Sequence, residues 1–179
     1  AGGYTMMTPK EESWNYTKKQ LLESISGLLA GRVSEEIVFN EISTGAHDDF
    51  KKATKIARSM VTEYGMSNLG PMMLEEPSEN TFLGRDYTKN RNISDTVAHE
   101  IDEEMRRIIN ECYDTTKKII KENRKLLDLI ANTLLEEETI TKEQIDYLVE
   151  HGHLPKEDEE VEEEKKEEVK EKKNKKDAE

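Results

Sequence analysis

The chain has 179 residues and a formal net charge of −13; 37% of its residues are charged and 34% are hydrophobic. This length suffices for one domain with its own core, whereas the acidic balance argues against a nucleic-acid-binding protein, because phosphate contacts require a basic face. No apolar run approaches the roughly 18 residues of a membrane-spanning helix, and the single cysteine, Cys112, cannot form an internal disulfide, which fits a reducing compartment.

Charge is concentrated at the C-terminal end. Residues 156–179 contain 12 acids and 8 lysines but only three aliphatic side chains, too few to bury against anything. The rest of the chain keeps 28 acids and 19 bases, a formal charge of about −9. We therefore predict one domain over residues 1–155 and a disordered, charged tail over residues 156–179.

Residues 1–16 read as a loop, and a helix is predicted from about residue 17 to residue 39. Its apolar side chains recur at helical spacing: Leu21, Leu22, Ile25, Leu28, Leu29, Val33 and Ile37. Gly27 and Gly31 interrupt this helix and predict the close approach of another backbone. A second helix is predicted between an N-cap at Ser43 or Thr44 and a stop at Gly65.

Residues 66–92 contain prolines and glycines that break the helical pattern, and we expect an irregular insertion with a possible short hairpin around "MML" and "TFL". A third helix is predicted from Ser94 and Asp95 to about residue 122. Its expected inward residues are Ile101, Ile108, Ile109, Cys112, Ile119 and Ile120. A fourth helix covers roughly residues 124–135. A fifth begins at Thr141, where Gln144 completes a capping box, and ends near residue 150. The predicted fold is an all-α bundle of about five helices.

Helical phase separates three polar residues at the start of the second helix. Asp49 shares a face with Ala53, Ile56, Met60 and Tyr64, whereas Asp48 and His47 project toward solvent or the edge of that face. A carboxylate on an apolar face either supports the positive end of the helix dipole or binds something, such as a metal ion. Position alone leaves both readings open.

Two further carboxylates raise the same question in the first helix. Arg32 and Glu36 lie four residues apart within the apolar stripe and predict an internal ion pair; the alternative is that Glu35 or Glu36 binds a metal. His99 and Glu103 imitate half of an H-E-x-x-H motif, but the second histidine is absent, so a surface position is expected. His151 and His153 flank Gly152 and give a weak metal signal.

Four motifs in this order carry a family resemblance: "LLAGRVSEEIVF", "STGAHDDFKKATKIARSMVTEYGMSNLGP", "FLGRD" and "SDTVAHEIDEEMRRIINECY". Together they resemble the peptidase domain of the FtsH family, the membrane-anchored, ATP-dependent AAA+ zinc metalloproteases, from about residue 3 to residue 153. The resemblance implies a homo-hexamer at the cytoplasmic face of the cell membrane that degrades unfolded or membrane proteins. It implies Zn²⁺ at the peptidase site and ATP with Mg²⁺ on an ATPase domain.

In that family an H-E-x-x-H helix supplies two zinc ligands and the general base, and the resemblance places the third ligand at Asp49. The 179 residues contain neither H-E-x-x-H nor ATPase motifs nor membrane spans. We therefore expect the chain to be a fragment that begins after the catalytic helix and is inactive alone. His47 and Asp48 also depart from the small or amide residues common there. A non-catalytic helical assembly module is the alternative function.

Overall fold

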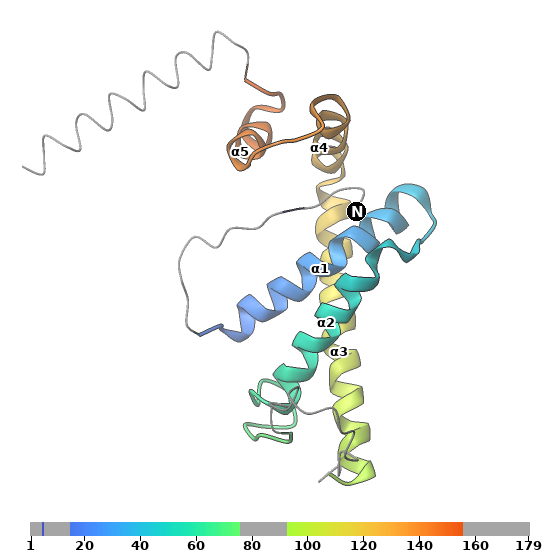
Figure 1. The fold of residues 1–179 in the computed structure, drawn as a ribbon, viewed down its shortest axis with the longest axis vertical. Helices are drawn as coiled ribbons and strands as arrows, with labels where there is room; N and C mark the ends of the chain where they lie inside the picture. The colour runs from blue at the N-terminus through green and yellow to red at the C-terminus, as the bar shows by residue number, and fades with distance from the viewer. Residues whose placement is uncertain (1–4, 6–14, 76–92, 156–179) are drawn as a thin grey trace, which may run out of the picture. The chain divides into compact units, whose positions relative to one another are not determined.

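The computed structural model describes residue 5 and residues 15–75 and 93–155. Within these ranges the chain forms five α-helices and one short 3-10 helix and contains no strand, which confirms the predicted all-α fold (Figure 1). The elements are α1 (Lys18–Phe39), η1 (Thr44–Ala46), α2 (His47–Thr62), α3 (Asp95–Glu122), α4 (Arg124–Glu137) and α5 (Lys142–His151). They fall into two compact units, Ala1–Lys121 and Glu122–Glu179. No helix in the described ranges is long and apolar enough to cross a membrane.

Side-chain caps fix where α1, α3 and α5 begin. The Thr17 hydroxyl accepts from the Gln20 backbone N–H at 3.2 Å while the Gln20 side chain accepts from the Thr17 N–H at 2.8 Å. The same reciprocal box joins Thr141 and Gln144 at the start of α5, as predicted. Ser94 accepts from the N–H of the third residue beyond it, at the start of α3. These caps satisfy N–H groups that have no partner inside the helix.

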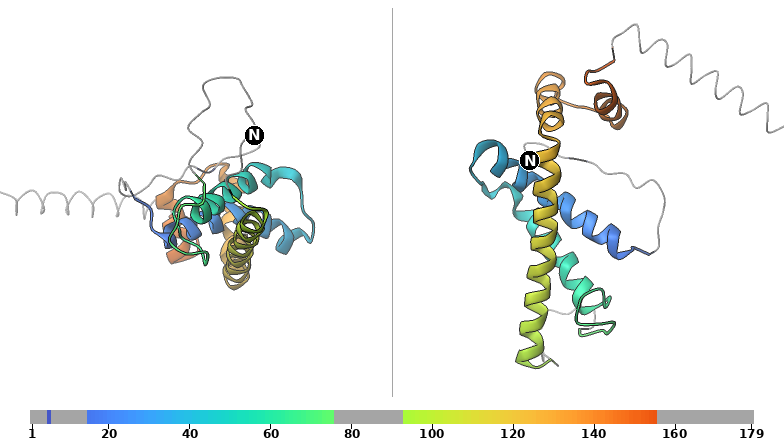
Figure 2. Two further views of the ribbon diagram at one scale, coloured as in Figure 1. Left: turned by 90° about the horizontal axis from the view of Figure 1, so that it is seen from below. Right: turned by 180° about the vertical axis from the view of Figure 1, so that it is seen from behind.

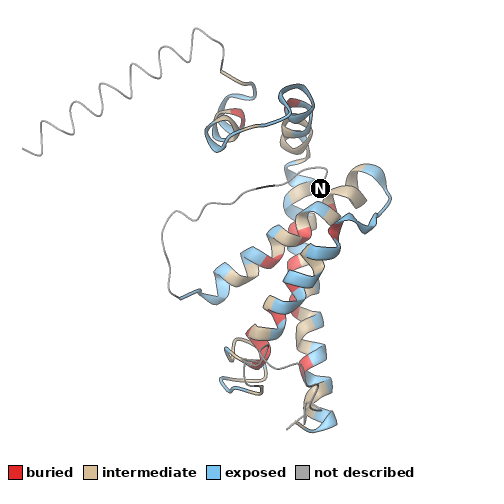
Figure 3. Ribbon diagram, viewed as in Figure 1, coloured by how far each residue is buried: buried red, intermediate tan, exposed pale blue. Residues whose placement is uncertain are grey.

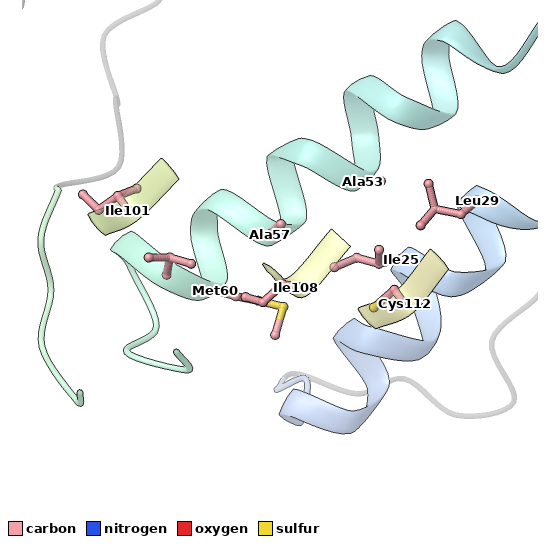
Figure 4. Packing of buried hydrophobic residues seen from close by; sticks show 9 residues of the cluster. Ile25, Leu29, Ala53, Ala57, Met60, Ile101, Ile108 and Cys112 are labelled. Carbon is pink, nitrogen blue, oxygen red and sulfur yellow. The ribbon is translucent and has the colours of Figure 1, made fainter. Parts of the chain in front are cut away.

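The core of the first unit lies where α1, α2 and α3 meet. Buried side chains from all three helices form it (Figures 3 and 4): Ile25, Leu29, Ala53, Ala57, Met60, Val61, Ile101, Ile108 and Cys112. Ala53 and Ala57 are fully buried, and their small side chains let α1 and α2 pack closely. Views from below and behind show the long α3 passing across both helices (Figure 2).

Two expectations about helix faces are wrong. Gly27 and Gly31 are exposed, and apart from the backbone of α1 itself and the two chain neighbours, no described atom lies within 4 Å of the place where a side chain would start. They lie on the side of α1 away from Ile25 and Leu29, so the core does not reach them. Ile119 is 51% exposed, whereas Thr116, three residues earlier on α3, is buried, so Ile119 does not face inward as predicted.

The described part of the insertion, residues 63–75, is tied back to α2. The backbone N–H groups of Leu74 and Glu75 donate to the Thr62 carbonyl at 2.7 and 3.3 Å, and the Arg58 guanidinium pairs with the Glu75 carboxylate at 2.7 Å. Gly65 has φ 59° and lies against Pro71, where a Cβ would come within 2.9 Å of the backbone. A glycine is therefore required at this turn.

Several predictions fall on segments outside the described residues. Residues 72–74, one half of the predicted hairpin, are not a strand, and residues 81–83, the other half, lie outside the described ranges. The predicted tail over residues 156–179 and most of the predicted N-terminal loop lie outside them as well. The domain boundary at residue 155 stays a prediction.

The second unit is a pair of packed helices, α4 and α5. Thr133 and Leu148 are its buried residues among those described, whereas Leu135 is 81% exposed and Val149 is 57% exposed. α5 ends at Gly152, whose left-handed backbone (φ 77°) forms the C-cap, as is common for glycine.

Glu104 on α3 anchors the loop that follows α2. Its carboxylate accepts from the Asn68 backbone N–H at 2.8 Å and from two nitrogens of Arg107 at 2.9 Å, and its side chain is 13% exposed. The Arg107 hydrogen bonds, helped by that of Asn68, lower the pKa of Glu104 from 4.5 to about 2. The ionised carboxylate therefore stabilises the folded state.

We predict that Glu104→Gln lowers the free energy of unfolding by about 1–2 kcal/mol at pH 7. The pKa of Glu104 is lower in the folded chain than in the unfolded chain. The stabilisation that Glu104 gives the folded state is therefore complete above pH 4.5 and is lost as the pH falls from 4.5 toward 2. Urea unfolding followed by circular dichroism across this range measures it. The Glu104→Gln variant should lose stability less steeply with falling pH than the native chain. Glu103→Gln, which removes an exposed ion pair, should show the same pH dependence as the native chain. Equal pH slopes for all three proteins would contradict the assignment.

Candidate metal centre

Asp49 lies in the first turn of α2, two residues after the helix begins at His47. Its side chain is half-buried, whereas His47 and Asp48 are exposed, so the orientation is the one that helical phase predicts. No described residue donates a hydrogen bond to the Asp49 carboxylate or forms an ion pair with it. Asp49 is thus a partly desolvated carboxylate whose acceptor positions the described chain leaves open.

A polar clamp between α1 and the following loop determines where α2 begins. An Arg32 guanidinium nitrogen donates to the Ser43 carbonyl at 2.5 Å. The Glu35 carboxylate accepts from the Ser43 hydroxyl at 2.7 Å and from the Ser43 N–H at 3.2 Å. The Ser43 hydroxyl also accepts from the Gly45 N–H and caps η1, which leads directly into α2. Ser43 is therefore held on both sides of its backbone, six residues before Asp49.

Arg32 has a second role in the same place. Its guanidinium lies over the Phe50 ring, 5.0 Å from the ring centre, a cation–π arrangement. Its side chain is 14% exposed, and its Nε, 3.8 Å from the Glu35 carboxylate, has no hydrogen-bond partner among the described residues. Since Phe50 is the neighbour of Asp49 in sequence, Arg32 restrains the first turn of α2 as well as the loop before it.

The predicted Arg32–Glu36 pair is wrong. Arg32 pairs with Glu35, one residue earlier, and Glu36 points instead to α3. There Glu36 accepts from the Lys117 ammonium at 2.5 Å and from the Tyr113 hydroxyl. The partner is different because α3 brings a lysine and a tyrosine, one helical turn apart, against the α1 stripe.

The electrostatics of Glu35 and Glu36 agree with these contacts. Hydrogen bonds from Ser43 lower the pKa of Glu35. Hydrogen bonds from Lys117 and then from Tyr113 lower the pKa of Glu36, and the Glu36 carboxylate in turn raises the pKa of Tyr113 to about 12. Both carboxylates are therefore ionised and already satisfied, which explains their half-buried positions without a metal.

The histidines do not join Asp49. His99 is exposed, and Glu103 forms an ion pair with Arg106 at 2.8 Å. His99 and Glu103, which match only half of an H-E-x-x-H motif, therefore lie on the surface as expected. Within the described ranges, no three or more His, Cys, Asp or Glu side chains are placed to hold one metal ion. Catalytic zinc needs three protein ligands and an open fourth position. Among the described residues, Asp49 is therefore not part of such a group of three ligands.

Sequence reasoning missed the Ser43 clamp and the Glu36 partners. Tyr113 and Lys117 stand four residues apart on α3, a spacing that shows they share a face but not which helix they meet. The sequence predicts Ser43 or Thr44 as the N-cap of the second helix, and this is wrong: Ser43 caps η1, whereas the N-cap of α2 is Ala46, which makes no side-chain cap hydrogen bond. The bonds from Ser43 back to α1 connect residues 8 and 11 positions apart through a non-helical turn, which no periodicity reveals.

We predict that Arg32→Met lowers the free energy of unfolding by about 1.5–3 kcal/mol, because the Ser43 carbonyl loses a charged donor in a half-buried position. Urea unfolding measures this change. Arg106→Met is the matched control, since Arg106 is 67% exposed and pairs only with its neighbour Glu103; it should change stability by less than about 0.5 kcal/mol. Equal stabilities for the two variants would show that the clamp does not hold α2.

Comparisons with known proteins show the family to which the chain belongs. The model for peptidase family M41 matches residues 1–148. The ATP-dependent zinc metalloprotease FtsH of Acholeplasma laidlawii is 58% identical over 154 residues, which cover 86% of this chain and 24% of that relative. The protein of the same name from Bacillus subtilis is 55% identical over 157 residues, 87% of this chain and 25% of the relative. The chain thus spans about a quarter of the length of the curated relatives it matches. This chain belongs to peptidase family M41.

Proposed function

We propose that this chain supplies part of the peptidase site of an ATP-dependent zinc metalloendopeptidase, and that Asp49 is one of the zinc ligands. The observation that carries the proposal is the half-buried Asp49 carboxylate, to which no described residue donates a hydrogen bond. Membership of family M41 and the names of its relatives, which are zinc metalloproteases, support zinc as the ion.

The physical argument concerns desolvation. A carboxylate that loses part of its water needs a hydrogen-bond donor or a cation in exchange. The neighbouring carboxylates show the first solution: Glu35 takes donors from Ser43, and Glu36 takes them from α3. Asp49 has neither, although α1 and the loop beside it hold its helix firmly. A metal ion is the partner that suits a single acceptor aimed in a fixed direction.

The remaining ligands are part of the proposal. Because the described residues offer one zinc ligand, the others have to come from elsewhere in the protein, and the resemblance to the FtsH family implies an H-E-x-x-H helix. The 179 residues alone are then inactive. When bound, zinc would polarise a peptide carbonyl and lower the pKa of a bound water. The contribution of this chain is to hold the Asp49 carboxylate at the start of a helix that Arg32 and Ser43 fix in place.

The same proposal covers the whole protein. The relatives are named as ATP-dependent, which supports an ATPase that uses ATP with Mg²⁺ and feeds polypeptide to the peptidase. We propose protein substrates, unfolded or membrane-embedded, and a homo-hexamer at the cytoplasmic face of the membrane, as the family resemblance implies. The acidic character of the chain, −13 overall, fits a protein partner better than a nucleic acid.

We predict that Asp49→Asn in the full-length protein removes most of the bound zinc and abolishes ATP-dependent proteolysis of an unfolded substrate such as casein. The amide keeps the size of the side chain but loses the charge and one acceptor. Mass spectrometry measures the zinc content, and the release of peptides from casein measures the proteolysis. ATP hydrolysis should persist, because the ATPase site involves none of these residues.

Asp48→Asn is the matched control. It removes the same charge one residue earlier, on the exposed side of the same helical turn. It should leave zinc content and proteolysis unchanged. If Asp49→Asn kept both properties, Asp49 would not be a ligand; if both variants lost them equally, the effect would belong to the charge of the first turn.

A further inference from the structure

Glu35 lies near the end of α1 and acts on the link to η1, residues 40–43, through a single residue. Its two carboxylate oxygens accept separately from Ser43, one from the hydroxyl at 2.7 Å and the other from the backbone N–H at 3.2 Å. The Ser43 hydroxyl accepts in turn from the N–H of Gly45, within η1, at 3.2 Å. A continuous chain of hydrogen bonds therefore joins the Glu35 carboxylate to the turn that leads into the helix of Asp49.

The packing around Ser43 leaves these hydrogen bonds little room to shift. A Cβ on Gly45 would lie 3.3 Å from the Ser43 hydroxyl oxygen, tighter than an ordinary van der Waals contact, and 4.0 Å from a Glu35 carboxylate oxygen. The Arg32 guanidinium holds the Ser43 carbonyl at 2.5 Å. Because η1 ends at residue 46 and α2 begins at residue 47, a displacement of Ser43 would move the first turn of α2, which carries Asp49.

The direction of a metal-binding carboxylate matters because zinc binds in a defined geometry, with Zn–O bonds of about 2.0–2.2 Å. Residues that orient a ligand from behind typically contribute about tenfold to a hundredfold to metal affinity or activity. No described side chain donates a hydrogen bond to the Asp49 carboxylate itself. Its orientation therefore has to come from the backbone of the first turn of α2, which the Ser43 contacts hold.

We propose that Glu35 is a positioning residue for the metal centre: by holding Ser43 it fixes the direction of Asp49 and thereby sets how tightly the site keeps its ion. The proposal rests on the assignment of Asp49 as a zinc ligand. It gives Glu35 a role different from the direct metal binding that the sequence left open, because Ser43 already engages each of its carboxylate oxygens.

Glu36 provides a matched comparison in the same turn of α1. The Glu36 side chain is 34% exposed and that of Glu35 is 32% exposed. The partners of Glu36, Lys117 and Tyr113, lie on α3. Both carboxylates hold α1 to a neighbour, but only Glu35 holds the link that leads to Asp49. A purely structural role would make substitutions at the two positions alike, whereas a positioning role separates them.

The test measures zinc affinity and zinc release in the full-length protein, with a chromogenic chelator competing for the ion. Glu35→Ala should weaken zinc binding by about tenfold to a hundredfold and speed zinc release by a similar factor. Glu35→Gln should stay within about fivefold of the native affinity, because the amide oxygen still accepts from the Ser43 hydroxyl. Glu36→Ala should lower the thermal midpoint of unfolding as Glu35→Ala does, but leave zinc affinity unchanged.

The outcomes separate this role from the assignment of Asp49. If Asp49→Asn lost its zinc while Glu35→Ala kept the native affinity, only the positioning role would be overturned. If Glu35→Gln lost zinc as fully as Glu35→Ala, Glu35 would be a ligand rather than a positioning residue. Equal losses in Glu35→Ala and Glu36→Ala would assign the effect to general destabilisation. Native zinc content in Asp49→Asn would overturn both the assignment of Asp49 and the role of Glu35.

Discussion

The hydrogen bond from the Arg32 guanidinium to the Ser43 carbonyl, 2.5 Å long, is the contact on which the placement of the candidate ligand depends. Ser43 belongs to the link between α1 and α2, and Glu35 holds the N–H and the hydroxyl of the same residue. With its donors and its carbonyl both engaged, the link has little freedom, so η1 and the first turn of α2 start in a defined direction. The contacts of α1 with the link therefore determine the direction of the half-buried Asp49 carboxylate, which makes no hydrogen bond of its own to the described residues.

The same stretch of α1 also holds α3. One residue after Glu35, Glu36 receives Lys117 and Tyr113, so two adjacent carboxylates tie α1 to two different neighbours. Adjacent helical residues point about 100° apart, which makes this division of contacts possible. In the apolar core, Ala53 and Ala57 are fully buried. The apolar core fixes how closely the helices approach, and the polar pairs fix their register.

The sequence predicted the helices well because their signals are local. The capping box at Thr141 and the apolar residues at helical spacing lie within a few residues of one another, and the structure shows both. What failed depended on distant partners: Arg32 and Glu36 have the right spacing for an ion pair, yet Ser43 and Lys117 supply the better ones. Likewise the exposure of Ile119 and Gly27 depends on which part of each helix meets the core. For the site, helical phase predicted the orientation of Asp49 and left the choice between a helix cap and a metal ligand open, and only the family resemblance favoured the ligand.

Three carboxylates of one small region illustrate how the surroundings of a residue determine its role. Glu35 and Glu36 are stabilised as anions by hydrogen bonds that lower their pKa values, and each thereby holds two parts of the fold together. Asp49 is buried to a similar degree but receives no such bonds from the described chain. A protein that needed only a helix cap there could have left the carboxylate in water, as Asp48 is. A half-buried carboxylate without a donor costs stability, and the cation proposed at Asp49 would offset that cost.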